Sequence, residues 1–246
     1  NLLAVPWVTL VLTPLGFLGL LHPAFWSLAA MAAHALHAVL EPMAQWPLAV
    51  WWWPRPPLAV GLFACLGAVL LVFPWSWRMR TLALPLLLPL LWWRPAVPPS
   101  GEFALLAADV GQGNAVLVRT AQHTLLFDAG PRYGLESDAG HRVLVPLLQS
   151  LQWPLDMLVL SHRDTDHVGG AASVLAMSPQ ATLLSSLEPT HALLAAHSGS
   201  RCEAGQRWSW DGVEFSILHP QAADYADQAR LPPNAISCVL RITNAR

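Results

Sequence analysis

Residues 161–170 have the sequence Ser161-His-Arg-Asp-Thr-Asp-His-Val-Gly-Gly170, directly after the apolar run Met157 to Leu160. The segment places two imidazoles and two carboxylates within six residues, namely His162, Asp164, Asp166 and His167. Imidazole and carboxylate are the ligands of zinc and of harder divalent cations. Alternation along an extended segment points His162 and Asp164 to the same side. The pattern predicts a hydrolytic metal site at the end of a strand.

Composition divides the chain of 246 residues into two halves. Residues 1–100 hold ten of the thirteen tryptophans and only five charged side chains, which is typical of membrane segments. Residues 101–246 hold nine arginines against fourteen acidic residues, a net charge of −5 before histidine is counted. That balance is typical of a soluble, mildly acidic domain.

We therefore predict transmembrane or interfacial helices in residues 1–94, a linker in 95–102 and a globular domain in 103–246. The apolar runs of the first part are Leu2 to Leu21, Leu58 to Phe73 and Leu82 to Trp93, with a weaker run from Ala24 to Leu40. Only the first run reaches the roughly 20 residues that a bilayer-spanning helix needs. Because the chain begins inside an apolar run and ends just after a strand-like run, we interpret it as a fragment of a longer protein.

The arginines near the apolar runs bear on orientation. Arg78 and Arg80 favour a cytoplasmic position for the segment between the second and third long runs, and if the third run crosses the membrane, the globular domain lies outside the cytoplasm. Arg94, after the third run, favours the opposite orientation.

The globular half alternates predicted strands with predicted helices, which indicates sheets covered by helices. Helical periodicity covers residues 142–152 and 168–177. Strands are predicted at residues 103–108, 115–118, 124–127, 157–160, 182–184 and 237–242, with a hairpin over 208–218 that turns on Asp211-Gly212. The three cysteines, Cys65, Cys202 and Cys238, are far apart and form no Cys-x-x-Cys pair, so we expect small buried side chains and no disulfide framework.

Four features in order give a specific resemblance: Asp109-Val-Gly-Gln-Gly113, Asp128-Ala-Gly130, the 161–170 motif, and the segment Asn234 to Leu240. The globular half resembles the metallo-β-lactamase fold, an αββα sandwich, and in particular the one carried by ComEC-family DNA-uptake channels of naturally competent bacteria. Residues 1–16 are similar to the end of that family's channel domain. The resemblance implies an α/β fold of membrane helices followed by an αββα domain that is truncated at its C-terminal end.

The resemblance also implies roles for the motif residues. His162 and Asp164 would serve one metal position, Asp166 and His167 would serve the other, and Asp166 would orient the attacking water. Asp164 stands where the wider superfamily has a second histidine, which favours Mn²⁺ over Zn²⁺ without excluding zinc. Asp109, Asn114, Asp128, Asn234 and Ser237 are the residues expected to line the pocket.

The function implied is DNA uptake at the bacterial inner membrane, with hydrolysis of the DNA strand that is not transported. Single-stranded DNA, the membrane and other competence proteins are the implied partners, and the soluble domain would lie in the periplasm. Two departures leave alternatives open. Asn114 replaces an acidic residue of the family, and Asn234-Ala-Ile-Ser237 keeps only the outer residues of its Asn-Asp-Asn-Ser pattern. The alternatives are a transport protein with a non-catalytic domain and a membrane-anchored metallohydrolase of another substrate.

Overall fold

The computed structural model describes residues 2–46, 49–228 and 230–244. The chain divides into two compact units, residues 1–51 and 52–246. The division falls inside the half that composition assigns to the membrane. The proposed boundaries of the linker, at residues 94 and 103, stay a prediction.

The first unit is a helical hairpin. The run Leu2 to Leu21 is helical in three consecutive segments, α1 (Ala4–Trp7), the π-helix η1 (Val8–Leu12) and α2 (Thr13–Leu18). The π-helical turns directly precede Pro14, which has no backbone N–H to donate. The weaker run forms α3 (Ala24–Ala44), and the indole of Trp7 donates to the Ala32 carbonyl at 3.0 Å. The two runs therefore pair with each other.

A second helical hairpin begins the second unit. Its helices are α4 (Leu58–Val72), α5 (Trp77–Thr81) and α6 (Ala83–Trp92). Gly67 lets α4 approach α6, because a Cβ at this position would lie 3.0 Å from Leu87. No helix in the described ranges combines the length and the hydropathy that a bilayer crossing requires. Transmembrane helices in residues 1–94 stay a prediction.

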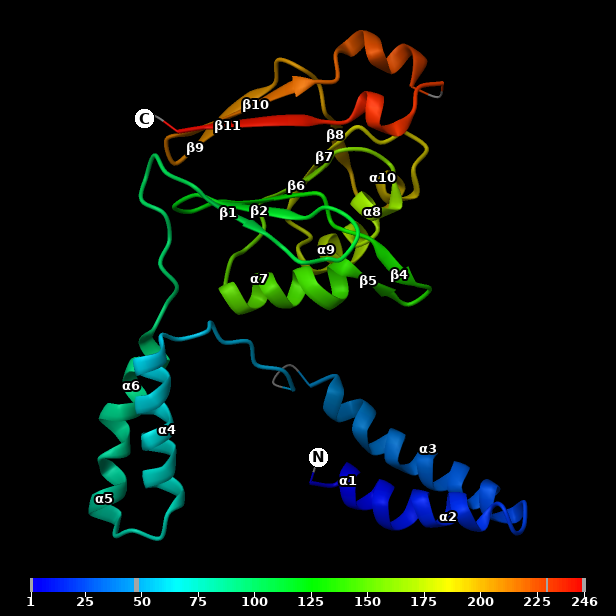
Figure 1. Ribbon diagram of the computed structural model, residues 1–246, viewed down its shortest axis with the longest axis vertical. Coiled ribbons are helices and arrows are strands. Elements are labelled where there is room, and N and C mark those ends of the chain that lie inside the picture. Colours follow the sequence, from blue (N-terminus) through cyan, green and yellow to red (C-terminus); the bar gives the residue numbers. More distant parts are fainter. Residues whose placement is uncertain (1, 47–48, 229, 245–246) are drawn as a thin grey trace. The chain divides into compact units, whose positions relative to one another are not determined.

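The globular domain is built on a six-stranded sheet in the order β1-β2-β3-β6-β7-β8 (Figure 1). The first three strands pair antiparallel and the other three join them in parallel. Their bounds are β1 (Ala104–Ala107), β2 (Val116–Arg119), β3 (Thr124–Phe127), β6 (Met157–Leu160), β7 (Thr182–Ser185) and β8 (Gly199–Arg201). The apolar runs predicted to be strands are confirmed. The sequence gives no signal for β8 because it is exposed and lacks apolar side chains.

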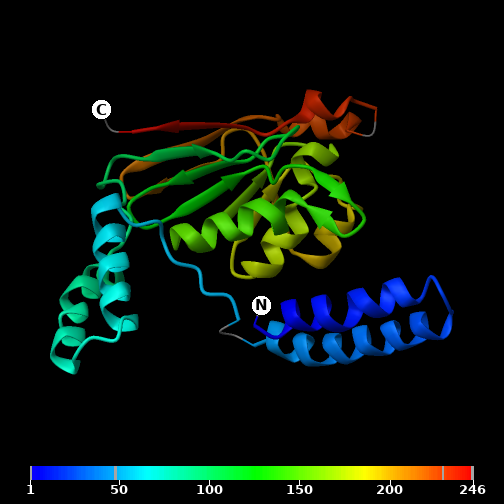
Figure 2. The ribbon, with the colours of Figure 1, turned by 60° about the horizontal axis from the view of Figure 1, so that its bottom comes forward.

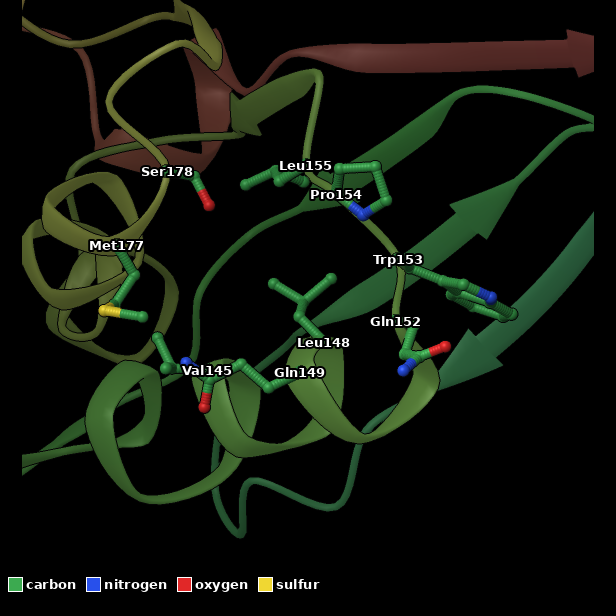
Figure 3. Close-up of a pocket in the computed structure, with 9 residues that line it drawn as sticks. All are labelled: Val145, Leu148, Gln149, Gln152, Trp153, Pro154, Leu155, Met177 and Ser178. Atoms are coloured by element: carbon green, nitrogen blue, oxygen red, sulfur yellow. The ribbon is translucent and has the colours of Figure 1, made fainter. Parts of the chain in front are cut away.

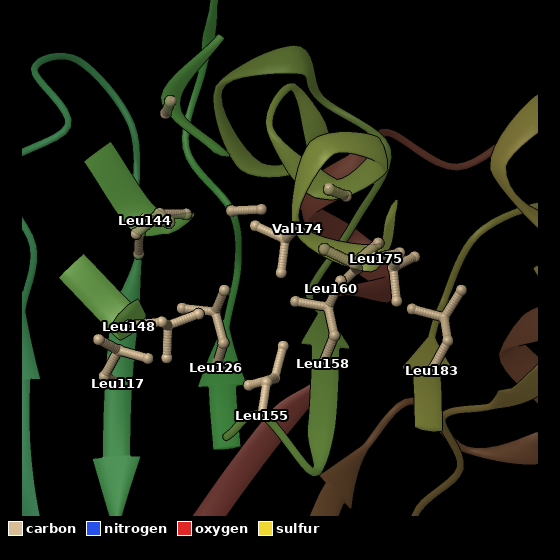
Figure 4. Packing of buried hydrophobic residues seen from close by; sticks show 14 of the residues in the cluster. Leu117, Leu126, Leu144, Leu148, Leu155, Leu158, Leu160, Val174, Leu175 and Leu183 are labelled. Atoms are coloured by element: carbon tan, nitrogen blue, oxygen red, sulfur yellow. The ribbon is translucent and has the colours of Figure 1, made fainter. Parts of the chain in front are cut away.

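Helices cover one face of this sheet (Figure 2). They are the π-helix η2 (Gly140–Leu144), α7 (Val145–Leu151), α9 (Ala171–Met177) and α10 (Ala192–Ala196). In the core between the layers, Leu126 and Leu158 of the sheet meet Leu148 of α7 and Val174 of α9 (Figure 4). The predicted helix at residues 168–177 is broken by Gly169 and Gly170, because the motif itself forms the separate helix α8 (Thr165–Val168).

A three-stranded sheet covers the opposite face (Figure 2). It consists of β9 (Arg207–Trp210), β10 (Val213–His219) and β11 (Val239–Thr243). Val159 of the first sheet packs in one cluster with Phe215 and Ile217 of the second. In the described part of the chain, the other elements after β10 are the 3-10 helices η3 (Ala222–Asp227) and η4 (Pro233–Ile236). The α/β/β layers of the predicted sandwich are therefore present, and its second helical layer is not among these elements.

The prediction of buried cysteines is confirmed for Cys202 and Cys238 and wrong for Cys65, and the prediction of no disulfide is wrong. Cys202 and Cys238 form a disulfide, with Cα atoms 6.0 Å apart, and Cys65 is exposed rather than buried. The bonded pair is separated by 36 residues. The pairing of β10 with β11 brings Cys238 close to Cys202, which follows β8. The spacing of the cysteines along the sequence does not reveal this contact.

The turn of the β9–β10 hairpin connects the two sheets by hydrogen bonds. Asp211 and Gly212 form this turn, as predicted, with φ values of 52° and 81°. The Asp211 Oδ2 atom accepts hydrogen bonds from Thr120 Oγ1 at 2.6 Å, Gln122 N at 2.8 Å and His123 Nδ1 at 3.1 Å. These donors belong to the turn between β2 and β3. The bond from Thr120 is the main cause that lowers the pKa of Asp211 to about 2.

We expect Asp211→Asn to lower the free energy of unfolding of the full chain by about 2 kcal/mol, because hydrogen bonds to a charged group contribute roughly 1.5–3 kcal/mol. Since folding lowers this pKa from 3.8 to about 2, the stabilisation is present above pH 3.8 and is lost as the pH falls toward 2. Thermal unfolding followed by circular dichroism over this pH range measures the difference. Asp227→Asn is the control, because Asp227 is 67% exposed. Equal effects of the two substitutions would contradict the prediction.

Candidate metal centre

Two parallel strands bring the motif together with Asp128. The strands β3 and β6 pair in parallel, so their carboxyl ends lie at the same edge of the sheet. Asp128 follows β3 with φ 60°, and its N–H donates to the Val159 carbonyl of β6 at 2.8 Å. Ser161 and His162 follow β6 directly. The pairing of β3 with β6 therefore brings together Asp128 and Ser161, which are more than thirty residues apart in the sequence.

The carboxylate of Asp128, which is 0% exposed, accepts four hydrogen bonds. Ser161 donates its N–H to Oδ1 at 2.7 Å and its hydroxyl to Oδ2 at 2.9 Å. Oδ2 also accepts from His167 Nδ1 at 2.7 Å and from Asn114 Nδ2 at 3.1 Å. A buried carboxylate is tolerated only with such partners, so this group organises the edge of the sheet.

This network assigns the tautomers of both histidines. His167 donates its Nδ1–H to Asp128. Because the Ser161 hydroxyl hydrogen points to Asp128, its oxygen accepts from His162 Nδ1, 2.9 Å away. In the neutral form of each ring, this arrangement leaves the Nε2 atom with the free lone pair. Metal-binding histidines are oriented in the same way, with the other ring nitrogen bonded to a carboxylate, carbonyl or hydroxyl.

The free Nε2 atoms face the carboxylates of the motif. His162 Nε2 lies 3.4 Å from Asp164 Oδ2, and His167 Nε2 lies 3.7 Å from Asp166 Oδ2. The two imidazole rings have centroids 4.1 Å apart and are tilted by 47°. Asp164 is the residue before α8, and Asp166 and His167 lie within it. All four side chains that the motif predicts as ligands are therefore neighbours.

The environment of His162 favours its neutral form. Burial lowers the pKa of His162, the nearby His167 lowers it further, and the surrounding carboxylates oppose these effects without reversing them. The neutral imidazole is the form that binds metals.

These donors fit a divalent cation by chemical type. Two imidazole Nε2 atoms and two carboxylates share one edge of the sheet, and the buried Asp128 accepts a hydrogen bond from the ring of His167. In the residues that the structure describes, no three histidine, cysteine or acidic side chains already converge on a single metal position. Binding would therefore require small rotations of the half-exposed Asp164 and Asp166 side chains.

The structure places the expected pocket-lining residues at different distances from the cluster. Asn114 and Asp128 are hydrogen-bonded into it. Ser237 lies next to Cys238, whose N–H donates to the Ser161 carbonyl at 2.8 Å. Asp109 is exposed and accepts from Gly111 N at 3.3 Å. In the described residues, no hydrogen bond joins Asp109 or Asn234 to the cluster.

Sequence reasoning missed the side chains that hold the motif from outside. Ser161 belongs to the motif, but only the hydrogen bond from its hydroxyl to Asp128 reveals its role. Ser186 donates its hydroxyl to the Ser161 carbonyl, and Gln228 Nε2 donates to the Ser186 carbonyl at 2.8 Å. Arg163 forms an ion pair with Glu188 at 2.6 Å. No local pattern marks Ser186, Gln228 or Glu188, because each acts across a long sequence separation.

A separate hollow of about 230 Å³ lies between α7 and α9 (Figure 3). Its lining carries no titratable side chain and consists of Val145, Leu148, Gln149, Gln152, Trp153, Pro154, Leu155, Met177 and Ser178. It therefore offers no metal ligand or proton-transfer group.

The layered fold and the motif at this sheet edge define a metallo-β-lactamase domain. The family model described as the metallo-beta-lactamase superfamily matches residues 108–219, which include the whole motif. Residues 1–78 match the model described as competence protein.

The chain is also similar to individual known proteins. The competence protein ComA of Neisseria gonorrhoeae is 34% identical over 251 residues, covering 98% of this chain and 33% of that protein. Recombination protein 2 of Haemophilus influenzae is 34% identical over 139 residues, covering 56% of this chain and 16% of that protein. A solved metallo-beta-lactamase with a HARLDQ motif from Cronobacter sakazakii is 20% identical, covering 63% of this chain and 61% of that one, with a TM-score of 0.42.

The chain belongs to the competence protein family and carries the metallo-β-lactamase domain in its second half. It spans a third or less of the length of the two curated relatives. The metallo-β-lactamase fold implies divalent metal ions.

We expect Asp128→Asn to weaken Mn²⁺ binding about 10- to 100-fold, the usual effect of removing a partner that orients a metal-binding imidazole. Calorimetric titration of the metal-free full chain with Mn²⁺ measures the affinity, and circular dichroism checks that the variant folds. Asp109→Asn is the matched control, because this exposed carboxylate does not contact the cluster. Unchanged affinity in a folded Asp128→Asn variant would exclude the orienting role.

Proposed function

We propose that the chain takes part in DNA uptake and that its metallo-β-lactamase domain hydrolyses phosphodiester bonds of the DNA strand that is not transported. The family membership supports the role in uptake. The observation that carries the hydrolytic part is the orientation of His162 and His167. In both rings Nδ1 is hydrogen-bonded within the domain and Nε2 lies near a carboxylate of the motif.

In this proposal His162 and Asp164 hold one metal position, and Asp166 and His167 hold the other. When bound, a pair of divalent metals supplies a water nucleophile that is deprotonated near neutral pH and neutralises charge on the phosphoryl oxygens. The carboxylate of Asp164 makes the donor set harder than a histidine would, which favours Mn²⁺ over Zn²⁺.

The residues of the chain orient the metal-binding rings and accept the proton of the attacking water. Asp128 and Ser161 keep both imidazoles in the required tautomer, so no rearrangement of their protons is needed. Asp166, at the exposed end of the cluster, is the carboxylate that orients the attacking water and accepts its proton.

We also propose a place for the chain at the bacterial inner membrane, with the metallo-β-lactamase domain on the periplasmic side and other competence proteins as partners. The match of residues 1–78 to the competence family supports membrane association. The disulfide between Cys202 and Cys238 supports an extracytoplasmic domain, because disulfides persist in oxidising compartments.

Asn114 favours a second candidate function, a non-catalytic domain that guides DNA. Its amide donates to Asp128 at 3.1 Å, where an acidic side chain would instead add a negative charge beside the metal positions. The same fold could then bind a strand without cutting it.

Incubation of the full chain with labelled single-stranded DNA and Mn²⁺ tests the two candidates. We expect cleavage that a chelator abolishes, and Asp166→Asn should lower its rate about 100-fold or more, the range of a lost general base. Asp227→Asn, outside the cluster, should cut normally. Metal binding and DNA binding without cleavage would support the guiding role. Absence of both metal binding and cleavage would overturn the hydrolytic proposal.

A further inference from the structure

A hollow of about 450 Å³ opens beside Asp166, on the exposed side of the metal cluster. It is lined by Gln112, Pro131, Arg132, Tyr133, Thr165 and Asp166. Three segments contribute to it, namely the glycine turn after β1, the strand β4 (Arg132–Gly134) and the start of α8. A volume of this size is that of a site for a small organic ligand or one unit of a polymer.

The hairpin of β4 and β5 (Ser137–Asp138) is held directly against the motif by backbone contacts. Gly169, just after α8, faces the backbone of Arg132 so closely that a Cβ would collide with its nitrogen. Gly113, with φ 144°, meets the backbone oxygen of Asp166 and a ring carbon of Pro131 in the same manner. Arg132 and Tyr133 therefore have a defined position relative to the cluster.

Arg132 lies in this hairpin and Arg142 follows it, while Glu136 and Asp138 of the same segment carry the opposite charge. Among the described residues, the ion pairs of arginine are Arg163–Glu188 and Arg230–Asp227, so Arg132 and Arg142 have no carboxylate partner. Arg132 donates only to the Leu135 carbonyl, at 3.2 Å. Its other donors remain available to a ligand on the exposed surface.

Tyr133 adds a fixed aromatic surface beside Arg142. Its hydroxyl donates to the Val110 carbonyl at 2.8 Å, which holds the ring, and the Arg142 guanidinium lies 5.6 Å from the ring centroid. The side chain is 44% exposed. A cation that follows the backbone, next to an aromatic ring on which a base stacks, is the combination used by sites for single-stranded nucleic acids.

We propose that this hollow is a subsite for a single-stranded nucleic acid, in which Arg132 binds the phosphate next to the bond that is cut and Tyr133 stacks on the adjoining base. Gln112 supplies an amide at the opposite wall. The inference rests on the proposed hydrolytic function and adds the residues that hold the strand.

Binding of fluorescent oligo(dT) to the full chain without metal, measured by anisotropy over a range of salt concentrations, tests the subsite. Arg132→Ala should weaken binding about tenfold and reduce the slope of log K against log salt by about 0.7, the value for one phosphate contact on a single strand. Tyr133→Ala should weaken binding about tenfold without changing that slope. Arg207→Ala, which removes an exposed arginine of β9, is the matched control and should bind normally. Wild-type affinity and slope in Arg132→Ala would overturn the proposal.

Cleavage assays separate this inference from the proposed hydrolysis. With Mn²⁺, Arg132→Ala should lower kcat/KM for the oligonucleotide about tenfold more than for bis(4-nitrophenyl) phosphate, a diester with a single phosphate that lacks the neighbouring phosphate Arg132 would bind. If the wild type cuts neither substrate while binding still depends on Arg132, the subsite stands and hydrolysis fails. If the wild type cuts both and Arg132→Ala lowers both equally or neither, hydrolysis stands and the subsite fails.

Discussion

The buried carboxylate of Asp128 connects the elements on which the candidate centre depends. It joins the end of β3 to the end of β6 through Ser161, to α8 through His167 and to the glycine turn through Asn114. Removing a carboxylate from water is costly, and here the cost is offset by four donors arranged around it. Because these donors can approach only from fixed directions, the carboxylate sets the orientation of the residues that face outward.

The architecture holds β3 at both of its ends. At the end that follows Phe127, Asp128 binds the motif, and at the end that precedes Thr124, Asp211 binds the turn between β2 and β3. The hydrogen bonds of Asp211 connect the three-stranded sheet to the six-stranded one. The centre therefore stands on two packed sheets and a helical layer, which is the rigidity that a site needs to keep side chains in position.

Local patterns predicted most of the strands of the globular half correctly. The apolar run Met157 to Leu160 is β6, and Asp211-Gly212 is a hairpin turn, because burial and turn geometry act over a few residues. The disulfide of Cys202 and Cys238 and the hairpin that carries Arg132 were missed. Both depend on segments that meet only after the sheets form, and neither has a hydrophobic period or a turn signal of its own.

The sequence alone determined the types of the candidate ligands and their position after a strand. Two histidines and two aspartates at this spacing after an apolar strand place all four side chains at one edge of a sheet. The tertiary structure decided which nitrogen of each ring is free, because the partners of the other nitrogens come from Asp128 and Ser161. It also decided that Arg132 and Tyr133 stand beside Asp166, because close backbone packing at Gly113 and Gly169 leaves the hairpin no other position. Both outcomes depend on contacts between distant segments, which spacing along the chain does not encode.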